Sequence, residues 1–333
     1  MQKVEKVNVK LINRDKTLGE SRLEFKLDGT NIDYIVANTI RRTILADIPI
    51  YAFNIFKFEK NTSVFHNDYL KLRLRHIPIW TIDNNIETFD IKETKKEEQE
   101  KDEEDEDFEM EVEKNINISS LKQLTMYVNH KNNTNEIMCV STAHAKFYYE
   151  EKLIESPYKT PIPIVKLQPN QEIAFSAITM MGTEQENAMY SAVCIAAYKM
   201  IKDNTFDFTV ESRGQIDEKR ILLVALINIE KQLKNFLKML KEDSKSISEE
   251  NNNEGMIIVN NEDHTLGNLI ARGMQMHKKI LFAGYNLPHP RVKKVHFHYK
   301  HVDNANIIKI IEDVVEYYTE IYTSIKKAVE KEL

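Results

Sequence analysis

Strand and helix patterns follow one another near the start of the chain. Apolar and polar residues alternate over residues 22–27, as in a half-buried strand. Thr30, followed three positions later by Asp33, resembles a capping box with Asp in place of Glu. Pro49 would end the helix that follows, and residues 51–58 return to strand character. The apolar residues at helical spacing are Ile32, Ile35, Val36, Ile40 and Ile44.

The same order of elements recurs near the end of the chain. Residues 256–259 are an apolar strand pattern followed by a polar turn. Asp263 or Thr265 would then cap a second helix. Residues 280–285 predict a strand, and residues 292–300 alternate in polarity as a further strand would. The apolar face of the capped helix holds Leu266, Leu269, Ile270, Gly273 and Met274.

A long amphipathic helix is predicted after each of these patterns. Small sheets could not cover two such apolar stripes, so we expect the long helices to pack on each other as a pseudo-symmetric pair. Two independent domains are the alternative, but the last stripe would then be exposed. The first stripe comprises Leu222, Ala225, Ile229, Leu233, Phe236, Leu237 and Leu240, and the second comprises Ile307, Ile308, Ile311, Val314, Val315, Tyr318, Ile321, Ile325 and Val329.

These patterns predict an α+β fold in which two αββ-type dimerisation modules pack as an intramolecular pseudo-heterodimer. Residues 119–200 contain mostly short strand patterns, which predicts an inserted β-rich domain. The expected boundaries are 1–47 and 204–241 for the first module, 48–203 for the insertion, 242–255 for a polar linker, and 256–333 for the second module.

The charge is unevenly distributed. The net charge is −6, but residues 97–113 hold twelve acidic residues and one lysine, so the rest of the chain is basic. Such a segment repels itself and cannot bury apolar surface, so we expect residues 85–118 to form a solvated acidic loop. A metal-dependent enzyme that uses this block is a weaker alternative. Deleting residues 93–113 would abolish the function of such an enzyme, whereas we expect little loss of assembly.

Catalytic and cofactor motifs are absent from the sequence. The eight glycines are too dispersed for a phosphate-binding loop, and HExxH and GxSxG do not occur. Cys139 and Cys194 suggest two buried thiols in a reducing compartment rather than a disulfide framework or a zinc site. No apolar run is long enough for a membrane helix, and the first residues lack the apolar core of a secretory signal. We therefore expect no catalytic residues, no metal and no cofactor.

Histidines offer two weaker hypotheses. His296, His298 and His301 could ligate a metal with Asp303, but polar positions on a solvated or partner-facing strand are the more common case. His264 beside Asp263 could be an acid–base pair, although such residues more often begin a helix.

The C-terminal module is basic, which raises a rival function. Between Met256 and His301 there are seven Lys or Arg residues and two acidic residues. A nucleic-acid-binding adaptor could use this face, and its affinity would fall steeply with salt. An acidic protein partner would use the same surface. The residues concerned are Lys278, Lys279, Arg291, Lys293 and Lys294.

Five stretches resemble one family. Residues 37–53, ANTIRRTILADIPIYAF, are similar to the signature of the alpha-like subunits of multisubunit DNA-directed RNA polymerases, which include bacterial alpha, archaeal D and the third-largest subunit of eukaryotic polymerase II. Residues 262–290, EDHTLGNLIARGMQMHKKILFAGYNLPHP, resemble the small archaeal L subunit and its eukaryotic counterparts. Further stretches similar to the D-like subunits are 61–79, 164–192 and 208–216. Both kinds of motif occur in this one chain, D-like first and L-like second. This arrangement resembles the fused subunit of large cytoplasmic DNA viruses.

The resemblance implies a non-catalytic scaffold that nucleates assembly of the two large catalytic subunits and docks small subunits, with DNA contacted only through the complex. Such a protein would work in the cytoplasm, in a viral factory or virion, or in the nucleus if cellular. An acidic run stands where some D-like members have cysteines, so we expect no metal there. We also expect no bacterial-type C-terminal DNA-binding domain.

The resemblance also assigns roles to individual residues. Asn38, Arg41 and Arg42 would face the second-largest subunit, where the planar guanidinium groups could pair with carboxylates. Ordinary surface arginines near a helix C-terminus are the simpler alternative. Residues of the L-like motif would form the intramolecular dimerisation contact: His264, Thr265, Leu266, Gly267, Asn268, Leu269, Phe282 and Tyr285.

Overall fold

The computed structural model divides the chain into two compact units, Met1–Ile48 with Ala192–Leu333, and Pro49–Ser191. The sequence predicted that the insertion ends at residue 203, whereas the second unit ends at Ser191. The boundary differs because strand β10 (Val193–Lys202) pairs with β11 (Thr205–Ser212) of the first unit. The residues described are 5, 7–17, 20–79, 124–149, 152–242, 247–251, 253–289, 292–303 and 305–333. All of the expected acidic loop, residues 85–118, lies outside them, including the segment 93–113.

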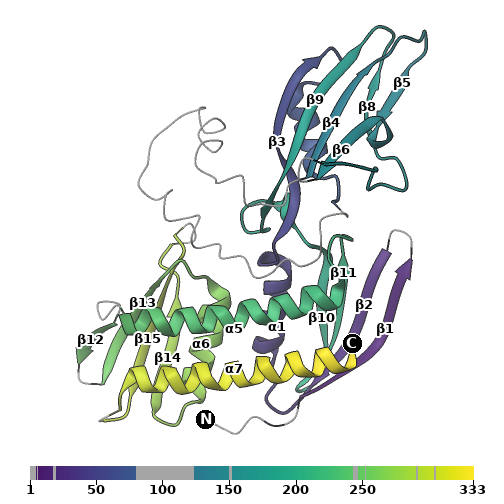
Figure 1. Cartoon of the computed structure of the whole chain (residues 1–333). Coiled ribbons are helices and arrows are strands. Elements are labelled where there is room, and N and C mark those ends of the chain that lie inside the picture. The colour runs from purple at the N-terminus through teal and green to yellow at the C-terminus, as the bar shows by residue number, and fades with distance from the viewer. Residues whose placement is uncertain are drawn as a thin grey trace. The chain divides into compact units, whose positions relative to one another are not determined.

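The first unit contains two four-stranded antiparallel sheets (Figure 1). In one of them, β1 (Asn8–Thr17), β2 (Glu20–Asp28), β11 and β10 are neighbours in that order. The alternation expected for residues 22–27 is confirmed, because Leu23, Phe25 and Leu27 are buried. The ring of Phe25 stacks on Phe208 across the β2–β11 pair, with 5.1 Å between their centroids.

Helix α1 (Tyr34–Ala46) follows β2, and its cap differs from the expected capping box. Asp33 is the N-cap, and its carboxylate accepts hydrogen bonds from the backbone N–H groups of Ile35 and Val36. The Thr30 hydroxyl instead donates to Glu5 at 2.8 Å. A single Asp therefore satisfies two of the free N–H groups of the first helical turn.

The second sheet of this unit has the order β12 (Ile247–Asn251), β13 (Glu254–Asn260), β15 (Lys294–His301) and β14 (Ile280–Asn286). Helix α6 (His264–Met276) lies between β13 and β14 in sequence and is capped by Asp263. The expected linker over 242–255 is wrong in part, because β12 lies within it and pairs with β13. Edge-strand pairing uses backbone groups, so an apolar pattern does not reveal it.

Two long helices accompany these sheets in the first unit (Figure 1). Helix α5 spans Glu218–Glu242, and helix α7 spans Ile307–Glu332. Most of the predicted stripe residues are buried, whereas Leu237 and Ile308 are half-buried. No helix in the described ranges is long and apolar enough to cross a membrane.

The second unit is β-rich, as expected for the middle of the chain. Its larger sheet has the order β3 (Ile50–Asn61), β9 (Glu172–Gly182), β4 (Leu124–Lys131), β6 (Ala145–Tyr149) and β7 (Lys152–Ile154). A two-stranded sheet pairs β5 (Met138–Ser141) with β8 (Pro163–Leu167). Helix α2 (Asn67–Arg75) contacts β3 and β8 and was not among the sequence expectations. Short 3-10 turns occupy Thr142–His144 and Ala188–Tyr190.

Both cysteines are free and exposed, so the expectation of buried thiols is wrong. Cys139 lies opposite Lys166 on the outer face of the β5–β8 pair, whereas its neighbour Val140 is buried. Cys194 lies where the register of β10 shifts between Val193 and Ile195. A strand places successive side chains on opposite faces, and a bulge changes which face is used.

Candidate functional site

Two equivalent ion pairs link helices α1 and α6. Arg42 of α1 donates from Nη2 to Asp263 Oδ2 at 3.2 Å and from Nε to Thr265 Oγ1 at 2.8 Å. Arg272 of α6 lies 3.6 Å, Nε to Oδ2, from Asp33, which caps α1. Each arginine follows the capping aspartate of its own helix by the same nine positions. This reciprocity, in which each helix binds the cap of the other, is the contact pattern of a two-fold interface.

The start of α6 holds most of the residues that the L-like motif assigned to the internal contact. Leu266 and Leu269 are buried, and the His264 ring meets the Tyr285 ring edge-on at 5.8 Å between centroids. A Cβ atom on Gly267 would lie 2.7 Å from the Tyr285 ring, so this position requires glycine for close approach. Thr265 and Asp263 both contact Arg42, whereas Asn268 is half-buried.

Phe282 does not take part in this buried arrangement. Its side chain is 59% exposed on edge strand β14. The next residue along, Ala283, is buried instead. The register of β14 shifts between Ile280 and Phe282, so the outward residue could not be assigned from alternation alone.

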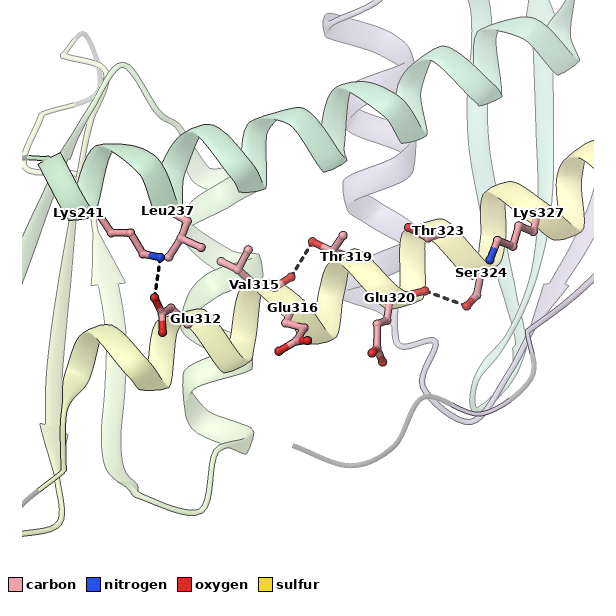
Figure 2. A pocket seen from close by; sticks show the side chains of 10 residues that line it. All are labelled: Leu237, Lys241, Glu312, Val315, Glu316, Thr319, Glu320, Thr323, Ser324 and Lys327. Atoms are coloured by element: carbon pink, nitrogen blue, oxygen red, sulfur yellow. Dashed lines mark hydrogen bonds and ion pairs between the residues drawn. The ribbon is translucent and has the colours of Figure 1, made fainter.

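Helices α5 and α7 run antiparallel. Lys241, near the end of α5, pairs with Glu312 near the start of α7 at 2.7 Å. Near the middle, Thr323 donates to Glu230 at 2.8 Å. At the other end, Lys219 donates to the backbone oxygen of Glu330 at 3.1 Å. Figure 2 shows the outer side of this pair, where the α7 hydroxyls of Thr319 and Ser324 bond to their own helix backbone.

Each long helix also contacts a sheet of the first unit: α5 meets the β12–β15 sheet, and α7 meets β1. Phe236 of α5 packs near Phe297 of β15, with 6.0 Å between ring centroids. Gln232 donates to Glu262 at 2.5 Å. Helix α7 contacts β1, and its Tyr317 hydroxyl accepts a hydrogen bond from Asn31 at 3.1 Å. Side chains from both sheets and both long helices therefore meet in the buried core of the first unit.

Tyrosines of α7 fill the junction of α1, α6 and α7. Tyr318 and Tyr322 are almost fully buried, and burial raises the pKa of both hydroxyls. A Cβ atom on Gly273 of α6 would lie 2.4 Å from Val314 and 2.8 Å from Tyr318. Glycine therefore lets α6 and α7 approach closely. These contacts make the junction part of the buried core.

The remaining residues expected to face a partner are on α1. Both Nε and Nη2 of Arg41 donate to Asn38 Oδ1 at 3.1 Å, so the amide orients the guanidinium. Both side chains are half-buried. Arg42, by contrast, is bound to the α6 cap.

The histidines expected as possible ligands have other surroundings. His298 lies 3.2 Å from Asn286 Oδ1, and His301 Nδ1 lies 2.8 Å from the backbone oxygen of Val302. Burial lowers the pKa of His296, and the nearby charges of Lys294 and His298 lower it further. Asp303 accepts a hydrogen bond from Asn253. Within the described ranges, no three His, Cys, Asp or Glu residues cluster in a way that could hold a metal. Arg291, expected in the basic face, lies outside those ranges.

Sequence comparisons give the class of protein to which this arrangement belongs. Residues 254–328 match the RNA polymerase Rpb3/Rpb11 dimerisation domain. The chain is thus a homologue of the alpha-like subunits of DNA-directed RNA polymerases, which confirms the resemblance carried by the motifs.

The relatives include a viral protein and cellular proteins. A protein of Acanthamoeba polyphaga mimivirus named as a DNA-directed RNA polymerase subunit is 24% identical over 329 residues, covering 94% of this chain and 91% of that protein. The human RPAC1 subunit of RNA polymerases I and III is 27% identical over 64% of this chain, which spans 61% of that subunit. The rpb11 subunit of RNA polymerase II from Dictyostelium discoideum is 32% identical over 23% of this chain, which spans 63% of it.

Proposed function

We propose that this chain is a non-catalytic assembly subunit of a DNA-directed RNA polymerase, on which the two large catalytic subunits assemble. The observation that carries the proposal is its similarity to two kinds of subunit. It is similar to RPAC1 over 213 residues and to rpb11 over 76 residues. A chain similar to both kinds supports a fusion of two subunits.

In this proposal the first unit is an intramolecular pseudo-heterodimer. One half consists of β1, β2, α1, β10, β11 and α5, and the other consists of β12 to β15, α6 and α7. The reciprocal pairs Arg42–Asp263 and Arg272–Asp33 support this division, as do the contacts between α5 and α7. Residues 49–191 are then the insertion. Covalent fusion keeps the two halves at a high effective concentration, so the scaffold does not depend on meeting a separate partner chain.

The proposed partners are the largest and second-largest polymerase subunits, together with small polymerase subunits, and DNA is reached only through the complex. Asn38 and Arg41 remain the proposed contact with the second-largest subunit, because Asn38 orients the Arg41 guanidinium. Arg42 is assigned instead to the internal contact. Work in the cytoplasm suits a viral complex, and work in the nucleus suits a cellular one.

Co-expression tests this function. The tagged full-length chain would be produced with the two large polymerase subunits of the same source. We expect all three chains to co-purify, and the two large subunits to fail to associate when this chain is left out. Association of the large subunits without it, or their absence from the wild-type pull-down, would contradict the scaffold role. Direct, strongly salt-dependent binding of duplex DNA by the isolated chain would favour the nucleic-acid adaptor.

A further inference from the structure

An apolar groove lies in the second unit, away from the residues used above. Its volume is about 370 Å³, and α2, the loop before it, and strands β5 and β8 provide its walls. Val64 and Phe65 line one side, and Ile137 and Ile164 lie among the other lining residues. Val64 is 69% exposed and Ile137 is 66% exposed. Exposed aliphatic side chains that gather at a groove are typical of an interaction surface.

A polar side chain holds the loop that presents Val64 and Phe65. The Asn61 amide donates to the backbone oxygen of Phe65 at 2.9 Å and to Asn67 Oδ1 at 2.8 Å. Its oxygen accepts from the backbone N–H of Ser63 at 3.0 Å and from the Ser63 hydroxyl at 2.7 Å. The apolar side chains at the tip are therefore held outward by a bonded loop.

The loop before Ile137 is built in the same way. Asn132 is fully buried and donates to the backbone oxygens of Glu136, at 2.8 Å, and Leu167, at 3.0 Å. Its oxygen accepts from the backbone N–H of Thr134 at 2.9 Å and from the Thr134 hydroxyl at 2.7 Å. Two asparagine-centred loops thus hold exposed aliphatic residues in place. Such preorganisation lowers the entropy cost of binding.

The apolar surface continues along one side of α2. The Phe65 ring stacks on Tyr69 at 4.6 Å between centroids, and Leu72 follows one helical turn later; both Tyr69 and Leu72 are exposed. The opposite side of α2 buries Leu70 and Leu74. The helix is therefore apolar on two sides, and its own unit covers one of them.

Charge indicates the kind of partner. Arg73 and Lys166 are exposed cations at the groove, and no carboxylate is among the described residues that line it. Arg73 donates to the backbone oxygen of Pro163 at 3.2 Å, which fixes it beside β8. A second copy of this chain that docked through the same groove would place these cations against their own equivalents, which is unfavourable. Nucleic-acid binding depends on many phosphate contacts, and two cations supply few of them.

We propose that this groove binds a segment of another protein that inserts an apolar side chain between Val64 and Ile137 and pairs a nearby carboxylate with Lys166 or Arg73. This proposal rests on the scaffold role in one respect, since the partner is a chain of the same complex. The groove gives that chain a docking point on the second unit.

Photo-crosslinking in the assembled complex tests the groove. Benzoylphenylalanine would replace Ile137 in the full-length chain, co-expressed with the other polymerase subunits. The control position is Leu153 on β7, which is in the same unit, 65% exposed, and outside the groove. We expect position 137, and not 153, to crosslink to one partner chain, within a segment that carries apolar residues and an Asp or Glu. A crosslink to a second copy, to nucleic acid or to a segment without a carboxylate would overturn the proposal, as would no crosslink.

Charge reversal provides a second readout. We expect Ile137→Asp and Lys166→Glu each to weaken binding of the crosslinked chain at least tenfold in pull-downs, while Leu153→Asp does not. Changing the partner's carboxylate to lysine should restore binding to Lys166→Glu. Lys166 and Arg73 are both exposed. Unchanged binding by both Lys166→Glu and Arg73→Glu would overturn the proposal even if Ile137→Asp failed to fold. A large subunit other than the crosslinked chain should stay bound in every variant. Absence of both large subunits from the wild-type pull-down would contradict the scaffold role alone.

Discussion

Arg42 and Asp263 lie 221 residues apart in sequence, yet their side chains meet at 3.2 Å. Arg272 and Asp33 form the equivalent contact in the opposite direction, at 3.6 Å. In each case an arginine of one helix binds the aspartate that caps the other. One interaction therefore stabilises a helix start and joins α1 to α6.

A double-mutant cycle should detect coupling between Arg42 and Asp263. Asp263→Asn keeps a good N-cap and removes only the charge, and Arg42→Ala removes the partner. Because both side chains are more than a third exposed, we expect a coupling of about 0.2–1 kcal/mol in the free energy of unfolding, measured by urea denaturation. Lys238→Ala, at the exposed end of α5, is the control. Full additivity of Arg42→Ala and Asp263→Asn would show that the pair contributes nothing.

Gly267→Ala should destabilise the protein although alanine is the better helix former by about 1 kcal/mol. The added Cβ would meet the Tyr285 ring at 2.7 Å, and overpacking typically costs about 1–3 kcal/mol. A decrease in the urea midpoint is the expected result. In a Tyr285→Ala background the same substitution should become neutral or stabilising. If it is equally harmful there, the ring is not the reason for glycine at this position.

Leu269→Asp should disrupt assembly. Leu269 is 1% exposed, and an unpaired charge buried there would cost several kcal/mol. We expect insoluble protein, or protein that no longer pulls down the two large polymerase subunits. Met276→Asp, at an exposed position of the same helix, is the matched control and should behave like the wild type. Soluble Leu269→Asp with a normal pull-down would contradict the shared core.

Acid should remove one contact between β1 and the region before α5. Burial raises the pKa of Asp217, but Lys16 and Arg14 outweigh it and hold this pKa below its usual 3.8. The stabilisation is therefore present above pH 3.8 and is lost as the pH falls through the lower, folded-state pKa. We expect Asp217→Asn to lower the melting temperature at pH 7, and the difference from the wild type to shrink below about pH 4. Asp15→Asn on the same strand controls for general charge effects. A gap that is constant with pH would exclude this pair as its cause.

Local sequence patterns were sufficient for most elements of the first unit. The alternation in residues 22–27 and the stripes of the long helices depend only on which residues face a core. The alternating residues and most of the stripe residues are buried as expected. The family resemblance also came from contiguous motifs. One signal in the sequence was not used: Arg42 and Arg272 each follow the capping aspartate of their own helix at the same spacing. The helix over residues 67–75 was also not predicted.

Other features depend on which distant residue or strand pairs with a given position, and local periodicity carries no information about that partner. β10 belongs to the first unit because it pairs with β11, and residues 247–251 form a strand because β13 offers its backbone. Bulges place Phe282 and Cys194 outward, which a strict two-residue alternation would not predict. The contact of Arg42 with Asp263 could not be foreseen for the same reason.

By itself, the sequence indicated most helices and strands of the first unit and the polymerase-subunit family, because these follow from local periodicity and contiguous motifs. Only the tertiary structure decided that an arginine of each of α1 and α6 binds the capping aspartate of the other helix. It also decided that Phe282 is exposed and that two asparagine-held loops frame a groove. Those outcomes depend on contacts between residues that are distant in sequence, and burial and pairing are properties of both partners together.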